Sequence, residues 1–252
     1  MSHSIEKPVI LFCFERENRN SVGVLLHSME SRGLADSLTL ELWDFDSAPQ
    51  VFSRFQRTAR MVAAAFSFMT FQTERVRRAL AKTLALKRNE DILIAGGPHA
   101  AALPEESLRL GFDIVSLSEG EETLPALLEC FVSEKNPKKL SEHLQSLHGI
   151  AWRDEIRKDR FATGKIHKNP LVIAADLDAC WTCSPQHSIT APLEITRGCF
   201  FACKYCFTPR LFAGRAILRC PRDAPLHPTP RFARSALPHP PIYSTPRNAF
   251  RR

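Results

Sequence analysis

Residues 91–98 read DILIAGGP, a short apolar run that stops at two glycines and a proline. The run predicts a buried β-strand over Asp91–Ala95, because a strand that is covered on both faces carries apolar residues without alternation. Just before it, Glu74–Lys87 places a valine and two leucines on one helical face, which predicts an amphipathic helix. A helix that leads into a buried strand is the repeating unit of a parallel sheet covered by helices.

The same alternation extends in both directions from this strand. Further strands are predicted at Pro8–Phe14, Leu38–Trp43, Arg60–Phe68 and Ile114–Leu117, and further helices at Ser21–Arg32 and Glu121–Phe131. Residues 1–135 are therefore expected to form an α/β domain with a doubly wound parallel sheet, whose right-handed crossovers place helices on both faces. In such sheets ligands bind beyond the carboxyl ends of the strands, so the loops after Phe66, Ala95 and Leu117 are the predicted place of a site.

The rest of the chain is less regular. Residues 136–190 are interpreted as a connector in which Gly149–Arg153 and Arg160–Lys165 pair as a small hairpin. A new strand at Leu193–Thr196 then leads into a cysteine-rich segment. Residues 212–252 are predicted to be disordered, because nine of the 18 prolines lie beyond Phe207 and no strand or helix period is visible there.

The net charge of +7 belongs to the end of the chain. Residues 207–252 hold nine Arg, no Lys and one Asp, a balance of +8, while the first 206 residues hold 25 basic and 26 acidic residues, a balance of −1. Nucleic-acid binding is therefore not expected, because it needs a basic face on the folded part. No run approaches the roughly 18 apolar residues of a membrane span. The N-terminus reads as a strand, not a signal peptide, so we expect a cytoplasmic protein without membrane association.

Three cysteines lie within eight residues in the stretch Cys199-Phe-Phe-Ala-Cys203-Lys-Tyr-Cys206. Three thiolates on one loop favour a 4Fe–4S cluster with one iron open to another ligand. A structural zinc site, which prefers four ligands and paired knuckles, and cysteines without a shared role remain the alternatives. The CxxC pair Cys180 and Cys183 is interpreted as part of the connector.

The CxxxCxxC spacing, with Tyr205 just before the last cysteine and Glu194–Gly198 upstream, resembles radical S-adenosylmethionine (radical SAM) enzymes. The resemblance implies that Cys199, Cys203 and Cys206 each bind one iron, that S-adenosylmethionine binds the fourth, and that Tyr205 lies near its adenine. It also implies an electron donor such as flavodoxin or ferredoxin. One electron from the cluster would cleave the cosubstrate to a 5′-deoxyadenosyl radical.

The first 135 residues resemble the flavodoxin-like cobalamin-binding domains, in which DxHxxG, SxL and GG loops follow successive strands. Ser67 and Met69 match the second loop, Gly96 and Gly97 the third, and the resemblance implies that they contact a cobalamin-like ligand. The first loop, residues 18–23, keeps the glycine but has Asn20 in place of the cobalt-ligating histidine, so any cobalamin would lack that lower ligand. Glu119 and Gly120 also resemble the radical enzymes that carry this domain, and the likeness covers roughly residues 5–210.

These resemblances lead to the expectation of a cobalamin-dependent radical SAM protein that performs methyl transfer or cyclisation on an unknown substrate. Only the first strand and the cluster loop of the family's α/β barrel are recognisable, over residues 191–211. A truncated or frameshifted chain that acts at most as a cobalamin-binding module is therefore the alternative. A ferredoxin-like electron carrier is disfavoured, because three cysteines with an open iron suit outer-sphere transfer poorly.

Overall fold

The structure is a computed structural model that describes residues 7–13, 15–133, 137–153, 164–172, 196–199, 201, 203–211 and 218–219. All of these residues belong to one unit of the chain, Met1–Cys220.

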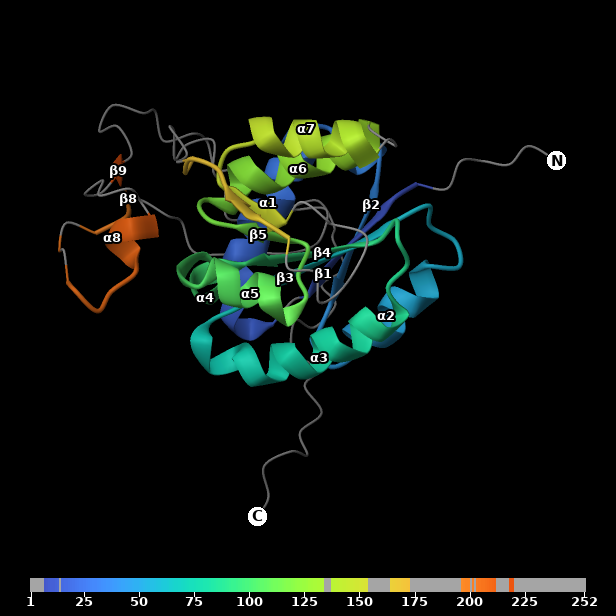
Figure 1. Ribbon diagram of the computed structural model, residues 1–252, viewed down its shortest axis with the longest axis horizontal. Coiled ribbons are helices and arrows are strands. Elements are labelled where there is room, and N and C mark those ends of the chain that lie inside the picture. The colour runs from blue at the N-terminus through green and yellow to red at the C-terminus, as the bar shows by residue number, and fades with distance from the viewer. Residues whose placement is uncertain are drawn as a thin grey trace, which may run out of the picture. The chain divides into compact units, whose positions relative to one another are not determined.

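A seven-stranded sheet with the order β2-β1-β3-β4-β5-β6-β7 forms the centre of this unit (Figure 1). The strands are β1 (Val9–Cys13), β2 (Thr39–Trp43), β3 (Val62–Ser67), β4 (Ile92–Gly96), β5 (Ile114–Ser116), β6 (Ile150–Arg153) and β7 (Ile166–Lys168). The first five are parallel, whereas β6 runs antiparallel to β5 and β7 antiparallel to β6. The carboxyl ends of β1, β3, β4 and β5 therefore meet at one edge.

Helices cover both faces of the sheet, as Figure 1 shows. On one face lie α2 (Ala48–Phe55), α3 (Thr73–Leu86), α4 (Gly97–Ala102) and α5 (Pro104–Leu110), and on the other α1 (Arg19–Ser31), α6 (Gly120–Ser133) and α7 (Pro137–Ser146). A hydrophobic core lies on each face of the sheet, and strand β1 contributes side chains to both. Val9, Leu11 and Cys13 pack against the helices of the first face, and Ile10 and Phe12 against those of the second. This alternation follows from the two-residue period of a strand.

The predicted doubly wound parallel sheet is confirmed for β1 to β5, each of which lies within two residues of its predicted bounds. The sheet continues into the segment expected to be a connector, because Ile150, Ala151 and Trp152 are apolar and become buried by extending it. The hairpin partner of β6 is Ile166–Lys168, which follows the predicted Arg160–Lys165. Residues 154–163 lie outside the described residues.

Beyond the sheet, two short strands pair antiparallel: β8 (Thr196–Arg197) and β9 (Leu218–Arg219). Strand β9 lies within the segment predicted to be disordered, and its two residues pair with β8 through their backbone. Residues 193–195, the rest of the predicted barrel strand, lie outside the described residues. A four-residue helix, α8 (Thr208–Leu211), follows the cysteines.

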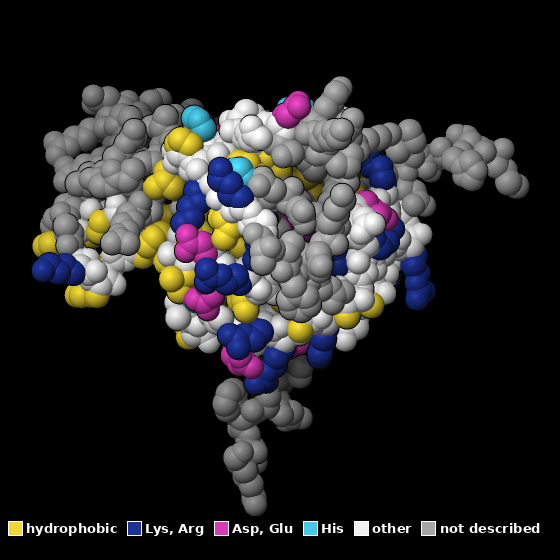
Figure 2. Space-filling model, viewed as in Figure 1, with side chains coloured by type: hydrophobic (Ala, Val, Ile, Leu, Met, Phe, Trp, Pro, Cys, Tyr) yellow, Lys and Arg dark blue, Asp and Glu magenta, His cyan; other side chains and the backbone are white. Residues whose placement is uncertain are grey.

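On the face shown in Figure 2, basic side chains are interspersed with acidic ones over α3, where Glu74 pairs with Arg78 at 3.2 Å. This mixture agrees with the near-neutral balance of the first 206 residues. Of the helices in the described ranges, none combines the length and the apolar character that a membrane span requires.

Candidate functional site

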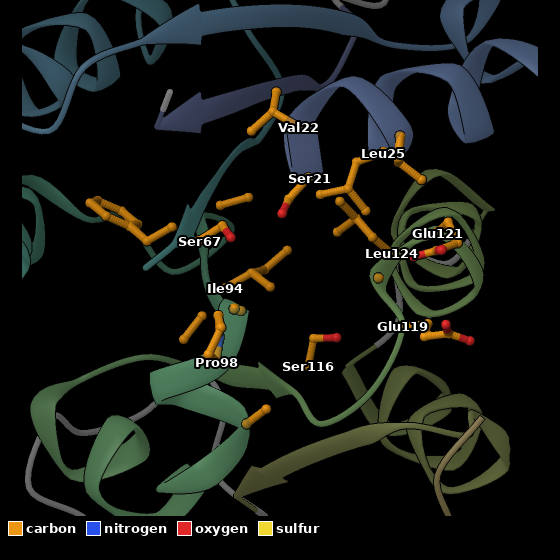
Figure 3. Close-up of a pocket in the computed structure, with 18 of the residues that line it drawn as sticks. Ser21, Val22, Leu25, Ser67, Ile94, Pro98, Ser116, Glu119, Glu121 and Leu124 are labelled. Atoms are coloured by element: carbon orange, nitrogen blue, oxygen red, sulfur yellow. The ribbon is translucent and has the colours of Figure 1, made fainter. Parts of the chain in front are cut away.

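A cavity of about 430 Å³ lies at the carboxyl ends of β1, β3, β4 and β5 (Figure 3). The first turns of α1, α4 and α6 complete its wall, and Arg197 and Leu211 reach it from the region of β8 and α8. This volume falls within the range of small-molecule and cofactor sites. Its position at the carboxyl ends of the strands is also the edge at which the sequence predicts ligand binding.

The wall combines hydroxyl groups with aliphatic side chains. Ser21, Ser67, Ser116 and Ser118 supply the hydroxyls, and Val22, Leu25, Ile94 and Leu124 most of the apolar surface. Figure 3 shows these groups arranged around an open centre, with Ser21 and Leu25 on α1 and Leu124 on α6. A wall of this kind suits a ligand with an apolar body and a few hydrogen-bonding atoms.

The paired glycines have different surroundings. Gly97 has φ +84°, and a Cβ atom added there would lie 2.7 Å from the backbone nitrogen of Phe68, 2.9 Å from its oxygen and 3.0 Å from Ser67 Oγ. The same Phe68 nitrogen donates to the Gly96 oxygen at 3.1 Å. At Gly96 the nearest atom to an added Cβ is Ser116 Cβ at 3.9 Å. Gly97 thus lets the β3 and β4 loops approach each other, whereas Gly96 faces the cavity.

Five of the predicted contact residues line the cavity: Ser67, Gly96, Gly97, Glu119 and Gly120. Met69 does not belong to the lining, and its side chain is 40% exposed. Its backbone nitrogen donates to Gln72 Oε1 at 2.9 Å, which fixes the start of the short 3₁₀ helix Thr70–Gln72. The second loop therefore reaches the cavity through Ser67.

The first loop contains a residue that the sequence reasoning missed. Asn18 is buried, and its Nδ2 donates to the backbone carbonyl oxygens of Cys13 at 2.9 Å and of Ser67 at 3.0 Å. Its Oδ1 accepts from the Glu15 nitrogen at 2.7 Å. Asn18 thus ties together the ends of β1 and β3, and its place at the start of the six-residue loop motif is the signal that could have identified it.

Asn20 lines the cavity on the exposed first turn of α1. None of the described residues that line the cavity is a histidine. A cobalamin bound here would therefore find no imidazole at position 20 to ligate its cobalt.

Two buried carboxylates lie at one side of the cavity: Glu119 just before α6 and Glu121 in its first turn (Figure 3). Glu119 Oε1 lies 2.7 Å from Nη1 of Arg197, and the same nitrogen bonds Glu121 Oε1. Burial raises the pKa of Glu121, and the charge of Arg197 opposes that shift. The sequence carries no signal of this contact, because 76 residues separate Glu121 from Arg197.

The three cysteines lie on the segment between β8 and α8, residues 198–207, which we call the cysteine loop. Cys199, Cys203 and Cys206 are half-buried and free, and the Cys206 nitrogen donates to the Cys203 oxygen at 3.0 Å. Hydrogen bonds from the hydroxyl and the backbone N–H of Thr208 lower the pKa of the Cys206 thiol, which favours the thiolate that binds metals.

Within the part of the chain that the structure describes, no three His, Cys, Asp or Glu side chains are gathered closely enough to hold a metal ion. The cluster ligands therefore remain a prediction. The side chain of Tyr205 is 93% exposed, and its predicted role beside adenine also remains untested.

Comparison with known proteins bears on the cavity. A search of curated proteins found no match to the chain. Among solved structures, the N-terminal domain of a hypothetical protein of Thermotoga maritima is 30% identical, with 49% of this chain and 93% of that chain covered and a TM-score of 0.33. The family model of the B12 binding domain matches residues 20–128. The matched residues include β2 to β5 and most of the cavity wall.

Proposed function

We propose that this protein binds cobalamin and that the cavity at the carboxyl edge of the sheet holds the nucleotide end of the cofactor. The observation that carries the proposal is the cavity of about 430 Å³, most of whose wall belongs to the part of the chain that matches the B12 binding domain. The serine hydroxyls would donate to polar atoms of the nucleotide, and the aliphatic side chains would flank its base.

The Ser21→Trp substitution tests this use of the cavity. Ser21 is exposed at the start of α1, so an indole there would enter the cavity without disturbing the core. We expect hydroxocobalamin to bind at least about tenfold more weakly, which corresponds to a loss of about 1.4 kcal/mol. An absorbance titration of the purified protein measures the Kd.

Ser31→Trp is the matched control, because Ser31 is exposed on the same helix and does not line the cavity. It should bind hydroxocobalamin like the natural chain. Equal affinity of the Ser21→Trp protein and the natural chain would show that the cofactor binds elsewhere.

We further propose that Cys199, Cys203 and Cys206 hold a 4Fe–4S cluster, and that the protein is a radical SAM protein of the cobalamin-dependent type. Two observations support this: the CxxxCxxC spacing and the half-exposed thiols. When bound, the cluster and S-adenosylmethionine supply reductive cleavage of the sulfonium. A small electron-transfer protein such as a flavodoxin or ferredoxin is the expected reductant.

Replacing Cys203 by alanine should remove the cluster. Two thiolates cannot replace three, so the iron content after anaerobic reconstitution should fall from about four per chain to near zero. Colorimetric iron analysis and the visible absorbance of the cluster measure the change. Cys130→Ala is the matched control, since Cys130 is a half-buried thiol of α6. Unchanged iron in the Cys203→Ala protein would refute the ligand assignment.

The reconstituted natural chain should also form 5′-deoxyadenosine from S-adenosylmethionine and dithionite, above the level of the Cys203→Ala protein. If the natural chain retained its iron but formed no 5′-deoxyadenosine, the radical chemistry would be refuted for this chain, while the cluster and cobalamin binding would remain.

A further inference from the structure

Arg197 joins the cavity to the cysteine loop through buried charges. Its side chain is 9% exposed, and its Nη1 bonds carboxylate oxygens of both Glu119 and Glu121. Ion pairs buried to this extent are sensitive to the loss of one partner, because the remaining charges are then poorly solvated. The contact therefore fixes the position of Arg197 more strongly than a surface pair would.

The carboxylate side of the contact is held firmly in the domain. Thr123 Oγ1 donates to the backbone carbonyl oxygen of Glu119 at 3.0 Å, and Ser28 Oγ of α1 donates to the backbone carbonyl oxygen of Glu121 at 2.5 Å. Between them, an added Cβ at Gly120 would lie 2.8 Å from Leu25 Cδ2, so the start of α6 packs closely on α1. Arg197 is thus anchored to a rigid part of the cavity wall.

The cysteine loop has both of its flanks at the cavity. Arg197 precedes Cys199 by two residues, and Gly198 between them has φ +92°, a conformation that turns the chain and favours glycine. Leu211 of α8, on the far side of Cys206, also lines the cavity. A ligand that filled the cavity would therefore contact the residues that flank the cysteine loop.

We propose that the Arg197–Glu119–Glu121 contact couples occupation of the cavity to the position of the cysteine loop. Arg197 is a positioning residue: it holds the loop at the cavity so that a bound cobalamin orders the three thiols. This inference rests on the proposed cobalamin binding. Coupling between sites is reciprocal, so ordering of the loop by a cluster should in turn strengthen cobalamin binding.

Alkylation of the iron-free protein tests the coupling. We would measure the rate at which iodoacetamide modifies Cys199, Cys203 and Cys206, with and without saturating cyanocobalamin, by mass spectrometry. Cys130 serves as the internal standard, because it lies on α6 and not on the cysteine loop. Cyanocobalamin should slow modification of the three loop thiols by about fivefold, the lower end of usual couplings, and leave Cys130 unchanged.

At a cyanocobalamin concentration that saturates the variant, set from its own Kd, the Arg197→Gln protein should show less than about twofold protection of the loop. Arg32→Gln is the matched control, since Arg32, which directly follows α1, pairs with Glu122 of α6 at 2.9 Å on the surface. It should retain the full protection. The double variant Glu119→Gln, Glu121→Gln removes both carboxylates that pair with Arg197 and should lose protection as Arg197→Gln does.

The measurement separates the two proposals, because the Kd for cyanocobalamin is determined on the same samples. Binding by the natural chain without protection of the loop thiols would overturn the coupling and leave the proposed function intact. Full protection in the Arg197→Gln protein would overturn the role of Arg197. Absence of cyanocobalamin binding by the natural chain would overturn both.

Discussion

The Gly97→Ala protein should be less stable than the natural chain by roughly 2–4 kcal/mol, and this loss should come from the fold itself. At φ +84° an alanine is strained, and its methyl group would lie 2.7 and 2.9 Å from backbone atoms of Phe68. Those atoms cannot move freely, because the Phe68 nitrogen donates to the Gly96 oxygen and its oxygen accepts from the His99 nitrogen. Urea unfolding at pH 7, followed by circular dichroism, measures the loss.

Gly96→Ala is the matched substitution one residue earlier, and it should behave in the opposite way. Gly96 is extended, with φ −149°, and an added Cβ has no atom nearer than 3.9 Å. The cost in stability should stay below about 1 kcal/mol, which is usual for alanine where the backbone accepts it. Its methyl group enters the cavity wall, so hydroxocobalamin binding should weaken by about tenfold through overpacking.

The pair of variants thus separates folding from ligand binding. Equal stability of the Gly97→Ala protein and the natural chain would mean that the β3 and β4 loops are further apart in solution than in the structure. A Gly96→Ala protein as unstable as the Gly97→Ala protein would show that the fold requires glycine at both positions.

Part of this site could be predicted from the sequence. Continuous apolar runs such as DILIA are typical of strands covered on both faces, so β1 to β5 and the edge they share were predictable. The glycine pair was also predictable as a place of close approach. Which glycine serves the fold was not, because that depends on the distance between Gly97 and Phe68, which belongs to a different loop.

Long-range pairing explains the other differences. Asn18 reads as one polar residue in a loop, and only the fold brings its amide to the Ser67 oxygen 49 residues away. Likewise β6 and β7 are short, and their membership of the sheet depends on the register in which Ile114 lies opposite Trp152. Neither contact leaves a periodic signal in the sequence, so local patterns cannot reveal them.

The Asp91→Asn protein should lose about 3 kcal/mol of stability, because Asp91 is a fully buried carboxylate whose Oδ1 pairs with Arg88 Nη2 at 2.9 Å. Asp91 is fully buried just before β4, where its Oδ1 accepts from the Val62 nitrogen at 2.9 Å. Its Oδ2 accepts from Gln56 Nε2 at 2.6 Å and from the Arg88 nitrogen at 2.9 Å. Asparagine keeps one acceptor oxygen, so an amide NH₂ would face donors on the other side and leave them unsatisfied.

The same carboxylate predicts how the loss depends on pH. Burial raises the pKa of Asp91, but hydrogen bonds from Arg88, Gln56 and the Val62 backbone outweigh burial and lower it below 3.8. A carboxyl group with a lowered folded-state pKa contributes stability above its unfolded pKa of about 3.9, and that contribution disappears as the pH falls through the folded value. The stability gap between the natural and Asp91→Asn proteins should therefore be constant above pH about 5 and shrink below about 4.

Glu90→Gln provides the contrast, because Glu90 pairs with the same Arg88 at 3.1 Å but is 45% exposed. An exposed pair contributes less than about 1 kcal/mol, so urea unfolding of this variant should nearly match that of the natural chain. A Glu90→Gln protein as unstable as the Asp91→Asn protein would show that pairing of the Arg88 charge, and not the burial of Asp91, determines the loss of stability. A gap between the natural and Asp91→Asn proteins that persisted unchanged to pH 3 would show that the lost hydrogen bonds, and not ionisation of Asp91, determine its contribution.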